Sequence, residues 1–282
     1  MALAGISLGS CGGSEDPGPT NTAPGFRVED PGPVHVHGLG VNPADGALFI
    51  ATHTGLYRSA PRQTTAKRVG DRLQDTMGFT VTGPDRFLGS GHPDGRDGQP
   101  PFLGLIRSAD AGRNWRPVSL LGKRDFHALE AAGARVYGYG SDFKTREQGL
   151  LVSEDRGRTW SGRRAPEPLL ALSADGARPD RVLAGGARAI WRSDDGARTW
   201  MRLAGPGGLV ASGRGGRAYR VTLDGSLSVS EETGRRWRSR GRVGGEPAAF
   251  ELSGEDLYVA LHDGTVKQST DEGRTWRVRS AP

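Results

Sequence analysis

Short apolar stretches separated by turn residues run along the chain, and they predict β-strands. Ala47–Thr52, Ala248–Leu252 and Asp256–Leu261 are examples, each bounded by Gly, Asp or Pro. No segment shows the apolar stripe with a 3.6-residue period that an amphipathic helix requires. The 45 Gly and 18 Pro among 282 residues fit the same interpretation, because tight turns need them. The pattern predicts an all-β chain.

A polar motif, Ser-x-Asp-x-Gly-x-Thr-Trp, follows five of these strand groups. Its copies begin at serines separated by 45, 40, 37 and 39 residues, namely Ser108, Ser153, Ser193, Ser230 and Ser269. This spacing is the length of one four-stranded propeller blade. The motif carboxylates are Asp110, Asp155, Asp195, Glu232 and Asp271. Five of the six tryptophans end the motif, as Trp115, Trp160, Trp200, Trp237 and Trp276.

Each residue type in the motif suits a hairpin turn. The carboxylate accepts hydrogen bonds from backbone N–H groups of its own loop, glycine takes a positive φ, and Ser or Thr satisfies a further backbone group. The tryptophan begins the next strand, where its ring is expected to pack under the turn and between blades. The motif is therefore interpreted as structural.

These motifs resemble the Asp-box, or bacterial neuraminidase repeat, of sialidases, sortilin-type receptors and photosystem assembly factors. The resemblance implies a β-propeller, and counting the strands that precede each motif predicts six four-stranded antiparallel blades over residues 34–282. In blade one the strands Leu39–Val41, Ala47–Thr52 and Gly55–Arg58 precede a degenerate motif, Ser59-Ala60-Pro61. Phe26–Val28 is expected to close the ring by pairing with the last blade.

The first residues resemble a bacterial lipoprotein signal. Leu8-Gly9-Ser10-Cys11 matches a lipobox, so residues 1–11 are interpreted as a signal remnant with Cys11 as the lipidated residue. Residues 12–33 hold few apolar side chains and many Gly and Pro, which is typical of an extended tether. We therefore expect an extracytoplasmic protein, anchored to the cell membrane through a lipid or secreted, and a monomer.

The net charge of +6 does not indicate a nucleic-acid partner. The basic residues are spread along the chain, with no run of Lys or Arg and no interleaved aromatic residues. A membrane surface and a metal, glycan or cell-wall ligand are the expected partners, and nucleic acid is not.

All six histidines map to one face of the expected propeller. His35, His37 and His127 are placed where the first strand of a blade begins, and His53, His92 and His262 in turns between second and third strands. Both positions lie opposite the motif turns, because consecutive strands of a meander reverse direction. Loops at this face of a rigid scaffold commonly carry function.

These histidines favour a transition-metal site on that face. Imidazole suits Cu and Zn, and His35 and His37 point to the same side of a strand. Met77 lies at the start of blade two, and a Met-plus-His cluster favours copper. The candidate ligands are His35, His37, His53, His92, His127 and Met77. Alternatively, the histidines hydrogen-bond backbone groups around the channel mouth, and His262 is the weakest candidate.

A second alternative is a glycoside hydrolase on the same face. Glu130, Asp142 and Tyr139 are its candidate catalytic residues, since glycosidases use paired carboxylates and sialidases a tyrosine nucleophile. Arg124, Arg164 and Asp125 can occupy the face too, but no spacing reproduces the sialidase three-arginine clasp, and Phe26-Arg27-Val28-Glu29 lacks the proline of the Phe-Arg-Ile-Pro motif.

The segment around Val34-His-Val-His37-Gly-Leu-Gly is also similar to the opening of bacterial Asp-box lipoproteins labelled glycosyl hydrolase or exo-sialidase, a label based on fold. A non-catalytic receptor or assembly propeller is the third possibility. The sequence thus predicts a lipid-anchored propeller that binds a ligand on a histidine-rich face, with Cu or Zn as the first choice.

Overall fold

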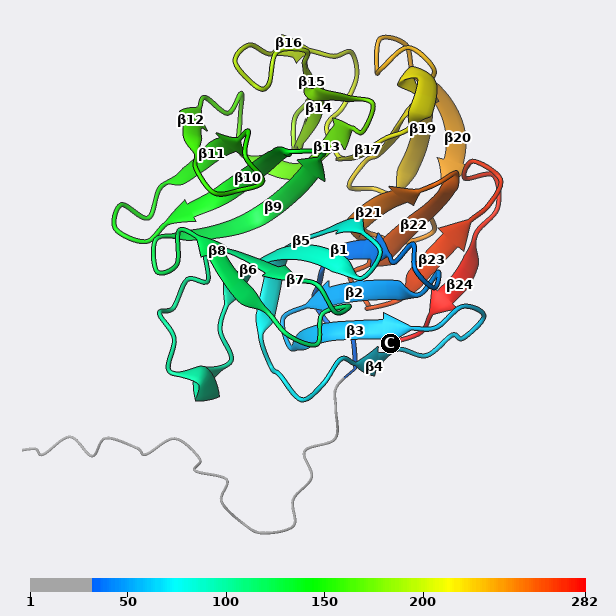
Figure 1. Cartoon of the computed structure of the whole chain (residues 1–282). Coiled ribbons are helices and arrows are strands. Elements are labelled where there is room, and N and C mark those ends of the chain that lie inside the picture. The colour runs from blue at the N-terminus through cyan, green and yellow to red at the C-terminus, as the bar shows by residue number, and fades with distance from the viewer. Residues whose placement is uncertain (1–31) are drawn as a thin grey trace, which may run out of the picture. The chain divides into compact units, whose positions relative to one another are not determined.

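The structure, a computed structural model, describes residues 32–282 and consists of six antiparallel sheets of four strands each. Figure 1 shows the sheets arranged in a ring with the first strand of each nearest the centre. The six-bladed β-propeller expected from the repeats is confirmed. Cys11, most of the expected tether and the Phe26–Val28 strand lie outside the described residues. None of the helices in residues 32–282 has the length and apolar character needed to cross a bilayer.

Each sheet is formed by consecutive strands, so within residues 32–282 no strand crosses into a neighbouring blade. Blade one contains β1 (Val36–Val41), β2 (Leu48–Thr52), β3 (Gly55–Ser59) and β4 (Lys67–Arg68). Blade two contains β5 (Asp75–Gly83), β6 (Arg86–His92), β7 (Leu105–Ser108) and β8 (Arg116–Ser119). Blade three contains β9 (Arg124–Ala132), β10 (Arg135–Asp142), β11 (Gln148–Ser153) and β12 (Ser161–Arg163).

The second half of the ring repeats this meander. Blade four contains β13 (Leu169–Asp175), β14 (Arg178–Gly186), β15 (Ile190–Ser193) and β16 (Met201–Arg202). Blade five contains β17 (Leu209–Ser212), β18 (Ala218–Val221), β19 (Ser226–Ser230) and β20 (Arg238–Arg242). Blade six contains β21 (Pro247–Ser253), β22 (Asp256–Leu261), β23 (Val266–Ser269) and β24 (Arg277–Ser280). Two short 3₁₀ turns, η1 (Gly95–Asp97) and η2 (Arg214–Gly216), interrupt loops.

Several first strands start earlier than the apolar pattern predicts. β9 begins at Arg124, where the sequence places a start at His127, because Arg124 pairs with Asp142 and Asp125 with Ser141 on β10. His127 therefore lies inside a strand. Polar residues extend these ladders because backbone pairing does not require apolar side chains.

The apolar core lies between neighbouring blades, and the motif tryptophans complete it. Trp115 packs on a cluster shared by blades one and two, and Trp160 on one shared by blades two and three. Trp200, Trp237 and Trp276 occupy the same place at the next three junctions. The expected inter-blade position of these rings is confirmed, and burying each ring joins one blade to the next.

The Ser-x-Asp turns are held by the hydrogen bonds that the sequence predicts. The Asp155 carboxylate accepts from the backbone N–H of Thr159 at 2.9 Å and from its hydroxyl at 2.7 Å. The Ser153 hydroxyl accepts from the backbone N–H of Gly157 at 2.8 Å, and Gly157 has a φ of +81°. The hydrogen bonds donated by Thr159 lower the pKa of Asp155, so the carboxylate is ionised at neutral pH.

Two of these turns provide a matched test. Replacement of Asp155 by alanine removes the acceptor for Thr159 and is expected to lower the Tm by a few degrees. In the fourth motif the described residues show no backbone N–H donating to the Glu232 carboxylate, only an ion pair with Arg236 at 3.4 Å. Glu232→Ala should therefore leave the Tm nearly unchanged, which calorimetry of both variants can measure. An equal decrease in Tm in both variants would show that the hydrogen bonds to the Asp155 carboxylate do not stabilise the turn.

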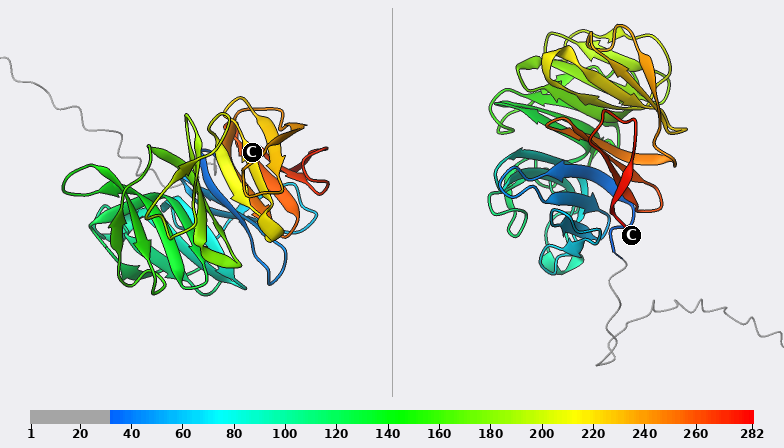
Figure 2. Two further views of the ribbon diagram at one scale, coloured as in Figure 1. Left: turned by 90° about the horizontal axis from the view of Figure 1, so that it is seen from above. Right: turned by 90° about the vertical axis from the view of Figure 1, so that its right-hand side faces the viewer.

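Side chains and one backbone hydrogen bond join the last blade to the first. The buried Arg279 guanidinium on β24 donates to the Ser59 hydroxyl at 2.7 Å and to the Gln63 carbonyl at 2.8 Å. The backbone N–H of Ala281 donates to the carbonyl of Thr64 at 2.7 Å. Figure 2 shows the blue first blade beside the red last strands. Ser59, the serine of the degenerate motif, is thus used for ring closure.

Candidate functional site

A β-bulge in the first strand of five blades directs one extra side chain toward the propeller axis. The ladder of β1 and β2 pairs Val36 with Thr52 and Gly38 with Ala51, which leaves His37 unpaired. The corresponding residues of blades two, three, four and six are Met77, His127, Leu170 and Ala248. All five line one cavity at the centre of the ring. Bulges commonly re-aim side chains in this way.

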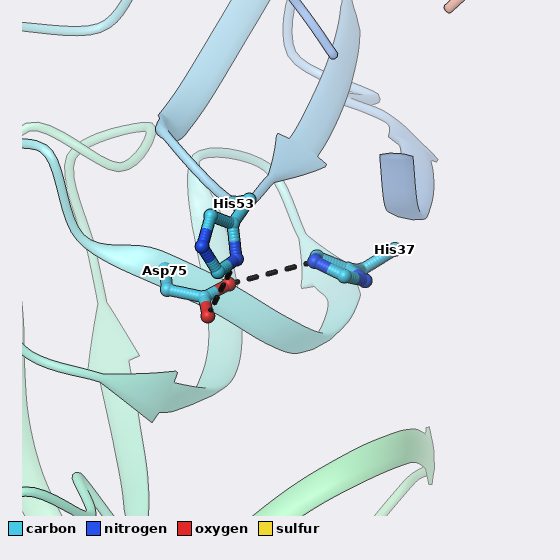
Figure 3. A group of neighbouring side chains, drawn as sticks. All are labelled: His37, His53 and Asp75. Atoms are coloured by element: carbon cyan, nitrogen blue, oxygen red, sulfur yellow. Dashed lines mark ion pairs between the residues drawn. The ribbon is translucent and has the colours of Figure 1, made fainter. Parts of the chain in front are cut away.

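His37, His53 and Asp75 converge beside this cavity (Figure 3). Asp75 begins β5, His37 comes from β1, and His53 from the turn between β2 and β3. His53 Nδ1 lies 2.9 Å from Asp75 Oδ2, and His37 Nε2 lies 3.5 Å from Asp75 Oδ1. One ligand atom from each residue lies within 4.8 Å of the other two. Two imidazoles and one carboxylate at this spacing are a possible metal site.

The cluster contains polar atoms that protein groups do not satisfy. The Asp75 side chain is only 10% exposed. Within residues 32–282 neither its Oδ1 atom nor His37 Nε2, which lie 3.5 Å apart, has a hydrogen-bond partner. Buried polar atoms normally have one, since an unsatisfied group costs about 1–3 kcal/mol. Burial lowers the pKa of His37 and outweighs the attraction of the Asp75 carboxylate. The ring is therefore neutral at pH 7, the state in which imidazole coordinates metals.

A second carboxylate lies next to the first. Asp125 is the second residue of β9, the equivalent strand of blade three, and His127 Nε2 lies 2.9 Å from its Oδ2 atom. His92 lies between the carboxylates, with Nδ1 3.2 Å from Asp75 and Nε2 3.4 Å from Asp125. The hydrogen bond to Asp75 raises the pKa of His92. Four of the six histidine rings thus contact Asp75 or Asp125, and His92 contacts both.

The central cavity is narrow, with a volume of about 70 Å³. Small-molecule sites generally have volumes of about 300–1,000 Å³, whereas one water occupies about 30 Å³ of liquid. His37, Met77 and His127 lie on its wall, together with Glu130 and Glu251. The space can hold an ion with some of its waters.

Glu130 on β9 and Glu251 on β21 face the channel from blades three and six. Burial raises the pKa of Glu130 to about 8, although the N–H of Ala174 offsets part of the shift. Burial and the neighbouring Glu130 raise the pKa of Glu251 well above its usual value. Glu130 therefore carries a proton at pH 7, because its buried position hydrates a carboxylate poorly.

Glu130 is expected to make stability depend on pH. The folded protein holds its proton up to about pH 8, whereas the unfolded chain releases it near pH 4.5. This contribution is therefore fully present below pH 4.5 and is lost as the pH rises to 8, by at most about 1.4 kcal/mol per pH unit. Glu130→Gln should flatten the dependence of unfolding free energy on pH between 5 and 8. Exposed Glu255→Gln is the control, and an unchanged slope in Glu130→Gln would contradict the assignment.

Two loops form a wall on one side of the cluster. The connection between β6 and β7 carries Phe102, whose ring lies 5.6 Å from that of His92 and 5.4 Å from Phe143 in the connection between β10 and β11. The Arg146 guanidinium lies over both phenylalanine rings, at 5.9 and 5.0 Å. The two loops pack against each other beside His92.

The remaining candidates lie apart from the carboxylates. His35 has a positive φ of 52°, and its ring lies 6.3 Å from that of His53, while His262 occupies the exposed turn after β22. Tyr139 is buried and donates its hydroxyl hydrogen to Gln148 Oε1 at 2.9 Å. Asp142 is paired with Arg124 at 3.2 Å, and backbone hydrogen bonds lower its pKa. Glu130, by contrast, lines the channel.

The sequence interpretation omitted Asp75 and assigned Asp125 to the glycosidase alternative. The sequence does contain a pattern that marks both carboxylates. Asp75 and Asp125 each stand two residues before the bulge residue of their strand, just as His35 stands two residues before His37. Aligning the first strands of the blades would have placed His35, Asp75 and Asp125 in equivalent positions. The described contacts of the clustered histidine rings are to carboxylates and not to backbone groups.

Solved β-propellers resemble this chain in fold. A chain of a nidogen/laminin complex matches with a TM-score of 0.63 at 11% identity, over 83% of this chain and 93% of that one. A GH74 enzyme of Niastella koreensis matches with a TM-score of 0.58 at 15% identity, over 88% of this chain and 45% of the enzyme. YCF48 from Cyanidioschyzon merolae matches with a TM-score of 0.52 at 14% identity, over 89% of this chain and 86% of that one.

No protein-family model and no curated protein matches the sequence. At 11–15% identity the structural likeness shows the β-propeller fold alone. The chain also spans less than half the length of the GH74 enzyme.

Proposed function

We propose that this chain is a metal-binding β-propeller that holds a Zn²⁺ or Cu²⁺ ion between His37, His53 and Asp75. One observation carries the proposal: three ligand atoms lie within 4.8 Å of one another, and His37 Nε2 and Asp75 Oδ1 are buried with no hydrogen-bond partner among the described residues. A cation between them would satisfy both atoms and neutralise the carboxylate. Water or a substrate would complete the coordination, as at catalytic zinc sites with three protein ligands.

The surroundings support an ion more than a larger ligand. Of the three proposed ligands, His37 lines the central cavity of about 70 Å³, and two further bulge residues with possible ligand atoms, Met77 and His127, line it too. Met77 would add a soft thioether close to the imidazoles, which favours copper over zinc.

Metal titration tests the proposal. Metal-free protein carrying Cys11→Ser, so that the thiol cannot bind, is titrated with ZnCl₂ or CuSO₄ and followed by calorimetry and elemental analysis. We expect tight uptake of at least one of the metals, and His37→Ala should weaken it at least about 100-fold, since even outer-shell changes cost about 10- to 100-fold. His262→Ala, in the exposed turn after β22, serves as the matched control. Failure to take up either metal, or full uptake by His37→Ala, would refute the proposal.

A glycoside hydrolase is the second candidate, favoured by the neighbouring carboxyl groups of Glu130 and Glu251. A protonated carboxyl with a pKa of about 8 has the state that a general acid needs. Turnover of aryl glycosides that Glu130→Gln abolishes would support this activity. Without turnover or metal uptake, a receptor for a protein or cell-wall partner would be favoured instead.

We further propose that the propeller is attached to the outer side of a membrane through a lipid on Cys11. The lipobox Leu8-Gly9-Ser10-Cys11 supports this, as does the tether-like composition of residues 12–33. Cys11→Ser is expected to move the protein from the membrane fraction to the soluble fraction of cells. An unchanged distribution on cell fractionation would refute lipid attachment at this residue.

A further inference from the structure

The surroundings of Asp125 resemble those of Asp75. Its side chain is 2% exposed, and its Oδ2 atom lies 2.9 Å from Nε2 of His127 and 3.4 Å from Nε2 of His92. Its Oδ1 atom is buried and has no hydrogen-bond partner in the part of the chain that the structure describes. A carboxylate this deeply buried normally has several partners or a cation.

The charge of the cluster is also unbalanced. Asp75 and Asp125 are both buried, and among residues 32–282 no Lys or Arg side chain lies within 4 Å of either carboxylate. In this part of the chain the ion pairs of both carboxylates are with histidine rings. One divalent ion at His37, His53 and Asp75 would compensate the first carboxylate and leave Asp125 with imidazoles alone.

The His92 ring separates the two carboxylates. Its Nδ1 faces Asp75 at 3.2 Å, and its Nε2 faces Asp125 at 3.4 Å. The two ring nitrogens point away from each other, so an ion at one nitrogen cannot also occupy the other. Each carboxylate therefore belongs to its own coordination position. A His92 ring that binds an ion through each nitrogen would release its N–H proton to solvent and act as imidazolate.

Backbone contacts hold Asp125 firmly in place. A Cβ atom at Gly140 of β10 would lie 1.8 Å from the Asp125 carbonyl oxygen, so only glycine permits the close approach of the two strands here. The next residue, Phe126, donates its backbone N–H to the Ser90 hydroxyl of blade two at 2.8 Å. Rigid backbone on both sides fixes the carboxylate beside His92 and His127.

From this geometry we infer that a second transition-metal ion binds at Asp125 and His127, with the His92 ring between it and the first ion. The inference rests on the proposed metal site at Asp75 and extends it to a two-metal centre. Paired metals allow one ion to activate water while the other orients a substrate oxygen. The second ion would use the Asp125 Oδ1 atom that the protein leaves unpaired.

The number of ions bound per chain tests the inference. The full chain carrying Cys11→Ser is titrated with Cu²⁺, and we expect two equivalents per chain. His127→Ala and Asp125→Asn should each bind one equivalent as tightly as the parent protein. Their affinity for the second equivalent should be at least about 100-fold weaker. Asp142→Asn, a carboxylate change on the same face, is the matched control and should retain two.

Electron paramagnetic resonance provides a second measurement. Two Cu²⁺ ions on either side of one imidazole ring should give a spin-coupled spectrum in the parent protein. His127→Ala loaded with copper should give the spectrum of an isolated ion.

The outcomes separate this inference from the first proposal. A single equivalent that His37→Ala removes and His127→Ala does not affect would refute the second site and leave the first intact. No uptake at all would refute both. Two equivalents that persist in His127→Ala and Asp125→Asn, with no spin coupling, would place the second ion elsewhere and overturn the inference.

Discussion

Replacement of Asp75 by asparagine is expected to weaken binding of the ion at His37 and His53 by more than about 100-fold. Asparagine preserves the size of the buried side chain but removes its negative charge and replaces one ligand oxygen with an amide nitrogen. Loss of an outer-shell partner alone costs about 10- to 100-fold in metal affinity, so loss of the only carboxylate ligand should cost more. Competition with a chromogenic chelator measures the affinity.

Asp142→Asn is the appropriate control, because Asp142 is paired with Arg124 outside the cluster. The Tm of both variants should remain close to that of the parent, which shows that any loss of affinity is local. If Asp75→Asn bound the ion as tightly as the parent, the ion would have to be held by other residues.

Arg279→Met is expected to destabilise the propeller by about 3 kcal/mol, the largest change in stability that we predict. Arg279 is 7% exposed, and its guanidinium donates to Ser59 and Gln63 of blade one from the last strand of blade six. Methionine has a similar length but no hydrogen-bond donor, so the carbonyl oxygens of Ser59 and Gln63 would lose a charged donor. Hydrogen bonds to charged groups contribute about 1.5–3 kcal/mol to stability. Chemical denaturation measures the change.

Arg277→Met is the matched control. Arg277 is exposed on the same strand, and its one side-chain hydrogen bond within residues 32–282 is to Gln268 of its own blade. It should change the unfolding free energy by less than about 0.5 kcal/mol. A loss below about 1 kcal/mol in Arg279→Met would mean that apolar contacts between the first and last blades close the ring.

The repeated motif was sufficient to predict the fold because its requirements are local. In the turn at Asp155, the carboxylate accepts from Thr159 four residues later, and the left-handed residue Gly157 lies between them. The motif therefore identifies the turn without knowledge of distant contacts. Strand limits were predicted less well. β9 extends to Arg124 because its partner strand continues to Asp142, which the apolar pattern does not indicate.

Ring closure was not predicted in the described part of the chain. The contact between Arg279 and Ser59 spans 220 positions, and nothing in either local sequence indicates it. The expected pairing through Phe26–Val28 lies outside residues 32–282 and stays a prediction.

The sequence alone determined the propeller, its blade count and the face on which the histidines lie, because repeat length and strand alternation follow from neighbouring residues. The tertiary structure decided which side chains meet. It brought His37, His53 and His92 to Asp75, and His92 and His127 to Asp125, from three blades. Bulges decide which side chains point toward the axis, and they depend on the register between paired strands. Buried, unpaired carboxylate atoms arise only when the blades pack around them.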